Sequence, residues 1–122
     1  MTTPWPAEIR LKRAEKMLEI DFAGGETFRL PAEYLRVESP SAEVQGHGPG
    51  QKQLVAGRKH VGIIGIDPVG NYAIRINFDD LHDTGIFSWT YLHTLGREMA
   101  QRWQIYLAQL EKAGLAREPK RS

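Results

Sequence analysis

Residues 17–30 have the sequence MLEIDFAGGETFRL, and their pattern is the clearest indicator of architecture in the chain. Leu18, Ile20 and Phe22 occupy every second position. A period of two places these side chains on one face of a β-strand, which predicts one buried face and one wet face. Gly24-Gly25 then provides the positive φ angles that a tight hairpin needs. The segment therefore predicts two antiparallel strands joined by a tight turn.

Two further elements adjoin this hairpin. Upstream, Glu8–Lys12 alternates with the same period, and Glu15-Lys16 marks the turn between the strands. Downstream, the short strand Thr27–Leu30 leads into Pro31–Arg36, where a proline at the first helical position costs no hydrogen bond. Ser39-Pro40-Ser41 ends this helix. The first third of the chain therefore predicts an antiparallel β-meander sheet with a short helix after its third strand.

A second hairpin is predicted in the middle of the chain. Val61–Ile66 is nearly continuous in β-branched and apolar residues, which is typical of a central strand. Residues 72–78 alternate with a period of two, and residues 67–71, DPVGN, have the composition of a turn. These two strands and their turn form an antiparallel pair.

The connection between the two hairpins, from residue 42 to about residue 60, lacks periodicity, and we expect it to be mobile. Gly46–Gly50 has no predicted strand before it and no helix after it, so we interpret it as a flexible loop rather than a phosphate cradle. Gln53–Lys59 is either an edge strand or a loop. Arg58-Lys59-His60 has no interleaved aromatic residues, which favours a solvated edge over a nucleic-acid site.

The last third of the chain changes period. Apolar and aromatic residues recur every three or four positions from Trp89 to Leu110, which predicts one amphipathic helix of about 25 residues, near 37 Å long. Ser88 is its expected N-cap and Gly114 its expected C-cap. Because a small sheet cannot cover that length, we expect the distal end to project. Trp103 and Tyr106 near that end are the candidate partner-binding residues.

Composition excludes several classes of protein. The chain of 122 residues has the length of one domain, which we place at residues 6–114 with a flexible basic tail at 115–122. It has no cysteine, which excludes disulfides, thiolate metal sites and cysteine nucleophiles. A net charge of +1 argues against nucleic acid as a partner. No apolar run approaches a membrane span, and residues 1–8 lack an export-signal pattern, so we expect a cytoplasmic protein.

The densest cluster of ligand-type side chains is Asp79, Asp80, His82 and Asp83. Three carboxylates and an imidazole can hold a divalent cation. Alternatively, the carboxylates solvate the loop and His82 fastens it, since the spacing matches no EF-hand and no H-E-x-x-H motif. Because adjacent side chains of an extended segment point to opposite faces, we reject a facial iron triad for His82 and Asp83. No serine has a nucleophile-elbow context, so we predict no enzyme, no catalytic residue and no cofactor.

Two segments together resemble a known family. The first is LPAEYLR at 30–36 with SPSAE at 39–43, and the second is VGNYAI at 69–74 running on through FDDLHDTGIFSW at 78–89. They are similar to the gamma-butyrobetaine hydroxylase-like N-terminal domain family over roughly residues 6 to 95. The resemblance implies a compact α+β domain, in agreement with the elements predicted above.

The resemblance also implies a zinc site that this chain has lost. Related domains of the oxygenases hold zinc with three cysteines, spaced Cys-x-Cys-x-x-Cys, and one later histidine. These positions fall on Ser39, Ser41, Val44 and His82. Serine is a poor zinc ligand and valine is none, so we predict no metal site. What remains for His82 is a structural role, such as a hydrogen bond from its loop to segment 39–44, while Asp80-Leu81-His82 departs from the family's usual Asp-Gly-His.

The family contexts imply partners. In gamma-butyrobetaine and trimethyllysine hydroxylases a similar domain precedes the catalytic jelly roll, and in some P-loop iron–sulfur carrier ATPases one is appended at the C-terminus. The resemblance therefore implies a non-enzymatic accessory domain that interacts with a protein, such as a P-loop iron–sulfur carrier ATPase or an iron-dependent oxygenase. The alternative is a metal- or small-ligand-binding protein that uses the Asp79–Asp83 loop.

Overall fold

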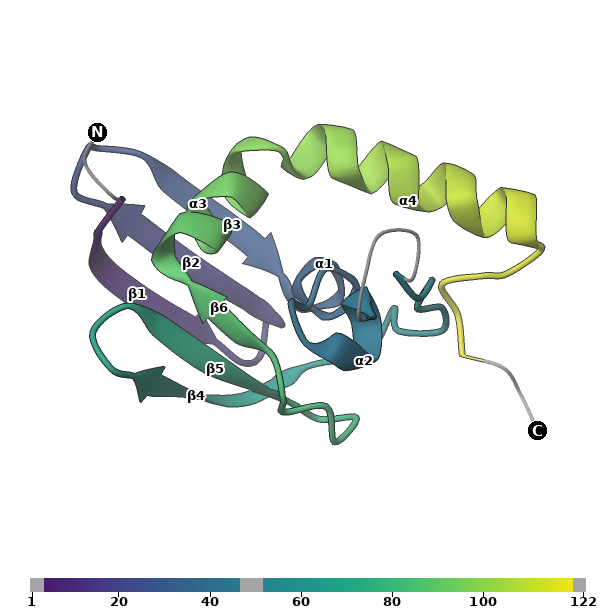
Figure 1. Cartoon of the computed structure of the whole chain (residues 1–122), viewed down its shortest axis with the longest axis horizontal. Helices are drawn as coiled ribbons and strands as arrows, with labels where there is room; N and C mark the ends of the chain where they lie inside the picture. Colours follow the sequence, from purple (N-terminus) through teal and green to yellow (C-terminus); the bar gives the residue numbers. More distant parts are fainter. Residues whose placement is uncertain (1–3, 47–51, 120–122) are drawn as a thin grey trace.

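A computed structural model describes residues 4–46 and 52–119 of the chain, so most of the predicted flexible loop Gly46–Gly50 and the end of the predicted tail lie outside the described residues. The elements, in chain order, are β1 (Pro6–Lys12), β2 (Met17–Phe22), β3 (Thr27–Pro31), α1 (Ala32–Val37), α2 (Ala42–Gln45), β4 (Ile63–Val69), β5 (Ala73–Phe78), β6 (Ile86–Ser88), α3 (Trp89–Arg97) and α4 (Met99–Ala113). The predicted α+β class is confirmed (Figure 1).

The N-terminal meander forms one three-stranded antiparallel sheet with the order β1-β2-β3. Leu18, Ile20 and Phe22 of the central strand are buried, as their alternation predicts. Gly25 has a φ of 99°, so the β2–β3 turn uses the left-handed backbone that its glycine permits. At the end of β3 the chain enters α1 directly, with Pro31 in the N-cap position rather than inside the helix.

The second sheet has the order β4-β5-β6, and it corrects two predictions. The strand predicted from Val61–Ile66 to be central is β4, which lies at the edge, while β5 is central. Pro68 explains this placement, because a residue without an N–H suits an edge strand. The strand also runs through Val69, so the turn is shorter than predicted and lies around Gly70.

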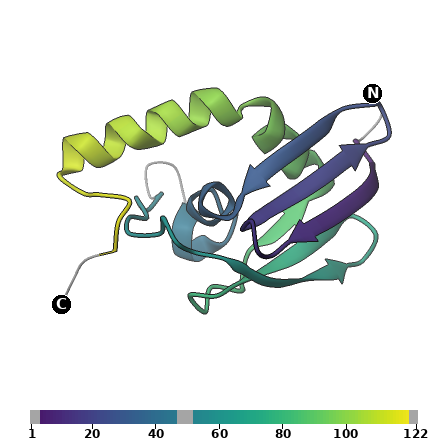
Figure 2. The same ribbon diagram turned by 180° about the vertical axis from the view of Figure 1, so that it is seen from behind.

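The predicted C-terminal helical region is present, but as two helices rather than one, because Glu98 separates α3 from α4 with φ −101° and ψ 11°. Both predicted caps are present: the Ser88 side chain accepts a hydrogen bond from the Tyr91 N–H, and Gly114 is left-handed. The break divides the apolar stripe between two surfaces. Helix α3 packs on β3, where a Cβ on Gly96 would overlap the Phe28 ring, while α4 extends away from both sheets (Figures 1 and 2).

Two hydrophobic clusters follow from this division. The main core lies between the two sheets, α1 and α3, and its largest side chains include Tyr34, Phe78 and Phe87. A smaller cluster joins Val37 of α1 to Tyr106 and Leu110 of α4, with Leu54 and Val55 packed against it. Gln53–Lys59 is therefore a loop rather than an edge strand, and this loop supports the underside of α4.

Sequence patterns did not predict two short elements. Helix α2 begins after Ser41, whose side chain accepts a hydrogen bond from the Glu43 N–H. Strand β6 pairs with β5 through Ile74 and Phe87. Both are too short to show a period, but together they hold the 39–45 segment and the 79–85 loop against the core.

Candidate functional site

The 79–85 loop is joined to the 39–44 segment by a chain of hydrogen bonds through His82. The Ser39 hydroxyl lies 2.9 Å from Nε2 of His82, and Nδ1 of His82 lies 3.1 Å from Oε2 of Glu43. A carboxylate accepts hydrogen bonds, so Nδ1 carries the proton of the neutral ring and Nε2 accepts from Ser39. The predicted hydrogen bond between the two segments is therefore confirmed.

A serine, a histidine and a carboxylate in this order resemble the arrangement that activates a nucleophile. Access of a substrate to the serine hydroxyl distinguishes a catalytic arrangement from a structural one. Ser39 has an exposed fraction of 0%, and Gly85 packs so closely on its hydroxyl that an added Cβ would overlap it. Gln45 also donates to the Ser39 carbonyl over 2.9 Å. A substrate carbonyl has no approach to this hydroxyl, so the chain of hydrogen bonds fastens two loops.

Burial and the charges around His82 favour its neutral ring. Burial lowers the pKa of His82, the positive charge of Arg36 lowers it further, and Glu43 offsets only part of this effect. Asp80 lies between two guanidinium groups, 2.8 Å from Nε of Arg36 and 2.7 Å from Nε of Arg58. Burial acts to raise the pKa of Asp80, but the Arg36 hydrogen bond and the two arginine charges together lower it.

The positions where related domains hold zinc come together in space, but their side chains do not fit the metal. Ser39 contacts His82, and Ser41 and Val44 are buried beside them on the segment around α2. Two hydroxyls, a methyl-bearing side chain and one imidazole cannot form a tetrahedral zinc site. Asp79 and Asp83 are exposed. Within residues 4–46 and 52–119, no group of three or more His, Asp or Glu side chains is placed to hold a metal ion.

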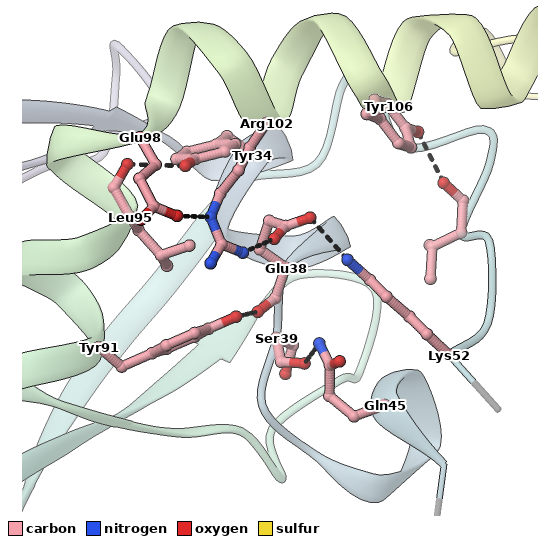
Figure 3. A network of polar contacts seen from close by, with 11 residues as sticks. Tyr34, Glu38, Ser39, Gln45, Lys52, Tyr91, Leu95, Glu98, Arg102 and Tyr106 are labelled. Carbon is pink, nitrogen blue, oxygen red and sulfur yellow. Dashed lines mark hydrogen bonds and ion pairs between the residues drawn. The ribbon is translucent and has the colours of Figure 1, made fainter. Parts of the chain in front are cut away.

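A second polar cluster lies where α1 ends beneath α4, as Figure 3 shows. The buried Glu38 carboxylate is 2.9 Å from Nζ of Lys52 and 2.5 Å from Nη1 of Arg102. The Tyr91 hydroxyl donates to the Glu38 carbonyl. Burial raises the pKa of Tyr91 to about 12, and the Glu38 charge adds to this effect. This cluster ties α4 to α1 and α3.

A groove of about 660 Å³ opens above Glu38, between α4 and residues 52–55. Its α4 wall includes Arg102, Tyr106 and the half-exposed Ile105. Tyr106, a predicted partner-binding residue, is buried, and its hydroxyl donates to the Val55 carbonyl over 2.6 Å. Its main contacts therefore lie within the chain.

Trp103, the other predicted partner-binding residue, lies one turn before Tyr106 on α4, and the centres of the two rings are 5.1 Å apart. It is half-buried, packs edge-on to Tyr34, and lines a separate hollow of about 410 Å³. The Arg117 guanidinium lies 5.2 Å from the centre of its ring. No sequence spacing could have found this contact or the Glu38–Arg102 pair, because the partners are far apart along the chain.

The fold and these contacts define a class: a small α+β domain of two antiparallel sheets, fastened by buried polar side chains at the end of α1. The chain belongs to the family described as gamma-butyrobetaine hydroxylase-like, N-terminal, whose sequence profile matches residues 9–93. This match confirms the resemblance found in the sequence. None of the curated proteins matches the chain.

Solved structures with the same fold include two proteins determined by NMR in solution. One is 45% identical to this chain with a TM-score of 0.85, and the likeness covers 99% of this chain and 95% of that protein's chain. The other is 47% identical to this chain with a TM-score of 0.82, and the likeness covers 100% of this chain and 94% of that protein's chain. A crystal structure of a protein with unknown function of the DUF971 family, from Acidithiobacillus ferrooxidans, is 43% identical with a TM-score of 0.63. That likeness covers 75% of this chain and 91% of the other.

Across the described residues, no helix combines the length and the apolar character that crossing a bilayer demands.

Proposed function

We propose that this chain is a non-enzymatic accessory domain that binds a protein partner in an iron–sulfur carrier or iron-dependent oxygenase system. The partner proposed for the first test is a P-loop iron–sulfur carrier ATPase, because domains that this chain resembles are appended to such enzymes. Cytoplasmic localisation belongs to the same proposal.

The observation that carries the proposal is the position of α4. The helix extends beyond both sheets (Figure 1). The residues of α4 line two separate hollows, one along each flank of the helix. Ile105 is 50% exposed on the wall of the larger groove. An apolar side chain beside cations and a concave surface is a common composition for the centre of a protein interface.

Direct binding of two purified proteins tests this proposal. We expect the full chain to bind the carrier ATPase in isothermal titration calorimetry, and Ile105→Asp to weaken binding at least about fivefold, since interface anchors contribute more than about 1 kcal/mol. Ile64→Asp is the matched control, because Ile64 is 57% exposed on β4, away from α4. Absence of binding by the wild-type chain, or equal weakening by both variants, would contradict the proposal.

The alternative function, metal or small-ligand binding by Asp79, Asp80, His82 and Asp83, receives less support from the contacts. Two arginines occupy the Asp80 carboxylate, and both ring nitrogens of His82 are hydrogen-bonded. This alternative predicts near-stoichiometric metal in untagged protein and its loss in His82→Ala. Elemental analysis that finds almost no metal in the wild-type protein would remove it.

A further inference from the structure

The carboxylate of Glu33 is engaged by an arginine from the far end of the chain. Glu33 lies in the first turn of α1, and its side chain is 7% exposed. Nε of Arg117 donates to Oε2 over 2.9 Å, and Nη2 donates to Oε1 over 2.7 Å. This is the bidentate geometry in which a planar guanidinium recognises a carboxylate. In the described part of the chain, Arg117 is the one cationic side chain that pairs with Glu33.

An aromatic face completes the contact. The guanidinium of Arg117 lies 5.2 Å from the centre of the Trp103 ring, within the range of a cation–π interaction. Tyr34, Met99 and Gln104 line the same hollow of about 410 Å³ beside Glu33 and Trp103. A buried carboxylate, an indole face and a concave wall together have the chemistry of a receptor for an arginine side chain.

The segment that delivers Arg117 is held by few other contacts. The Gly57 N–H donates to the Ala116 carbonyl over 2.9 Å, and the Lys59 N–H donates to the Arg117 carbonyl over 3.0 Å. Glu118 pairs with Lys59 and His60, but all three side chains are exposed. Exposed ion pairs contribute little to stability, so Arg117 is the principal side-chain anchor of this segment, beside the two backbone hydrogen bonds.

We propose that the Glu33–Trp103 site is a binding site for an arginine side chain of a protein partner, and that Arg117 occupies it in cis until the partner's arginine replaces it. The inference rests on the proposed function and names what the partner presents. Arginine fits better than lysine, because a single ammonium cannot engage both carboxylate oxygens and cover the indole face at once. Because Glu33 is buried, its carboxylate needs a cationic partner at all times. Arg117 therefore leaves the site only when the partner's arginine enters it.

The test uses N-acetyl-arginine amide as the probe and the indole N–H signal of Trp103 in heteronuclear NMR spectra as the readout. The full-length Arg117→Ala variant is expected to show a saturable shift of this signal, while the signals of Trp5 and Trp89 stay in place. Glu33→Gln added to Arg117→Ala should abolish the shift. N-acetyl-lysine amide should bind at least about fivefold more weakly. The wild-type chain should bind the arginine probe at least about tenfold more weakly, because its site is already occupied.

Arg117→Lys is the second variant and keeps a positive charge beside Glu33 if the alanine variant does not fold. The proposal is overturned if a folded Arg117 variant shows no saturable shift, or if the lysine probe binds as well as the arginine probe. Either result would mean that Arg117 is only a structural clip. The probe experiment contains no protein partner. Its failure would therefore not contradict the proposed binding of the carrier ATPase at the Ile105 groove.

Discussion

At the scale of single residues, His82 connects two loops through both of its ring nitrogens. Nδ1 donates to Glu43 and Nε2 accepts from Ser39, and burial beside Arg36 holds the pKa of His82 below its ordinary value of 6.5. Protonation would require the Ser39 hydroxyl to rotate and accept from Nε2, and it would add a buried positive charge next to the Arg36 guanidinium. The acid form of His82 therefore favours the unfolded chain.

The stability of the domain should fall as the pH drops below about 6.5. Between the lowered pKa of folded His82 and about 6.5, the unfolded chain binds more protons than the folded chain, so the free energy of unfolding rises with pH. The contribution of neutral His82 to stability is fully present above that window. His82→Gln cannot titrate. Its urea midpoint should differ less between pH 7.5 and pH 5.5 than the wild-type midpoint does.

His60→Gln is the matched control for this measurement, because the His60 side chain is 60% exposed in the structure. It should keep the wild-type pH dependence. If His82→Gln also keeps that dependence in full, His82 is not the group that titrates.

Leu81 precedes His82 in a backbone conformation that favours glycine. Its φ is 71°, and its side chain is 89% exposed, so it gains almost nothing from packing. A left-handed non-glycine residue costs about 1–2 kcal/mol, while glycine costs about 0.5–1 kcal/mol in chain entropy. Leu81→Gly should therefore raise the free energy of unfolding by up to about 1 kcal/mol, measured by thermal and urea unfolding.

Leu81→Ala separates this explanation from the loss of an exposed apolar side chain. Alanine keeps the Cβ and therefore the strain, so it should not stabilise the protein. Equal gains from alanine and glycine would show that the backbone is not the cause.

At the scale of elements, local patterns predicted the strands well and their arrangement less well. The alternation around Leu18 and the turn at Gly25 depend on neighbouring residues, so β2 and β3 were predictable. The edge position of β4 depends on which strand pairs with β5, although Pro68 inside the strand was a signal that could have been used. The hydrogen bond from His82 to segment 39–44 was predictable only through the family resemblance.

The break between α3 and α4 depends on contacts that no helical period contains. Gly96 lets α3 approach the Phe28 ring of β3, and Arg102 of α4 reaches Glu38, 64 positions earlier in the chain. A continuous apolar stripe gives no sign that its two halves pack on different surfaces. Two helices with different partners therefore resemble one long helix in the sequence.

Gly96→Ala tests how closely α3 packs on β3. Alanine improves helix propensity by about 1 kcal/mol, but its Cβ would overlap the Phe28 ring, and overpacking costs typically about 1–3 kcal/mol. We expect a net decrease in the free energy of unfolding of about 1 kcal/mol. Gly24→Ala is the control, since a Cβ there meets nothing within 4 Å. A stabilised Gly96→Ala protein would mean that the helix is free to move away from Phe28.

At the scale of the whole molecule, the C-terminal segment returns to α1 after the helices end. The sequence predicts a domain that ends at residue 114 and a flexible tail beyond it, and this boundary stays a prediction. Leu115 begins the return, and Arg117 brings it to Glu33, 84 positions earlier. A contact of that separation leaves no local pattern, which is why the sequence after Gly114 predicts a flexible basic tail.

Truncation decides whether the domain ends at residue 114. A chain that ends at Gly114 would leave the Glu33 carboxylate, 7% exposed, without its cationic partner. Breaking a fully buried pair costs about 3–5 kcal/mol, but the Arg117 side chain is 38% exposed, so solvent screening reduces the expected loss to about 1–2 kcal/mol. A chain that ends at Pro119 keeps this pair and is the control, with a urea midpoint close to that of the full chain. If both truncated chains unfold at the full chain's midpoint, Arg117 does not stabilise Glu33 and the boundary at residue 114 is right. If only the shorter chain is destabilised, the folded unit extends at least to Arg117.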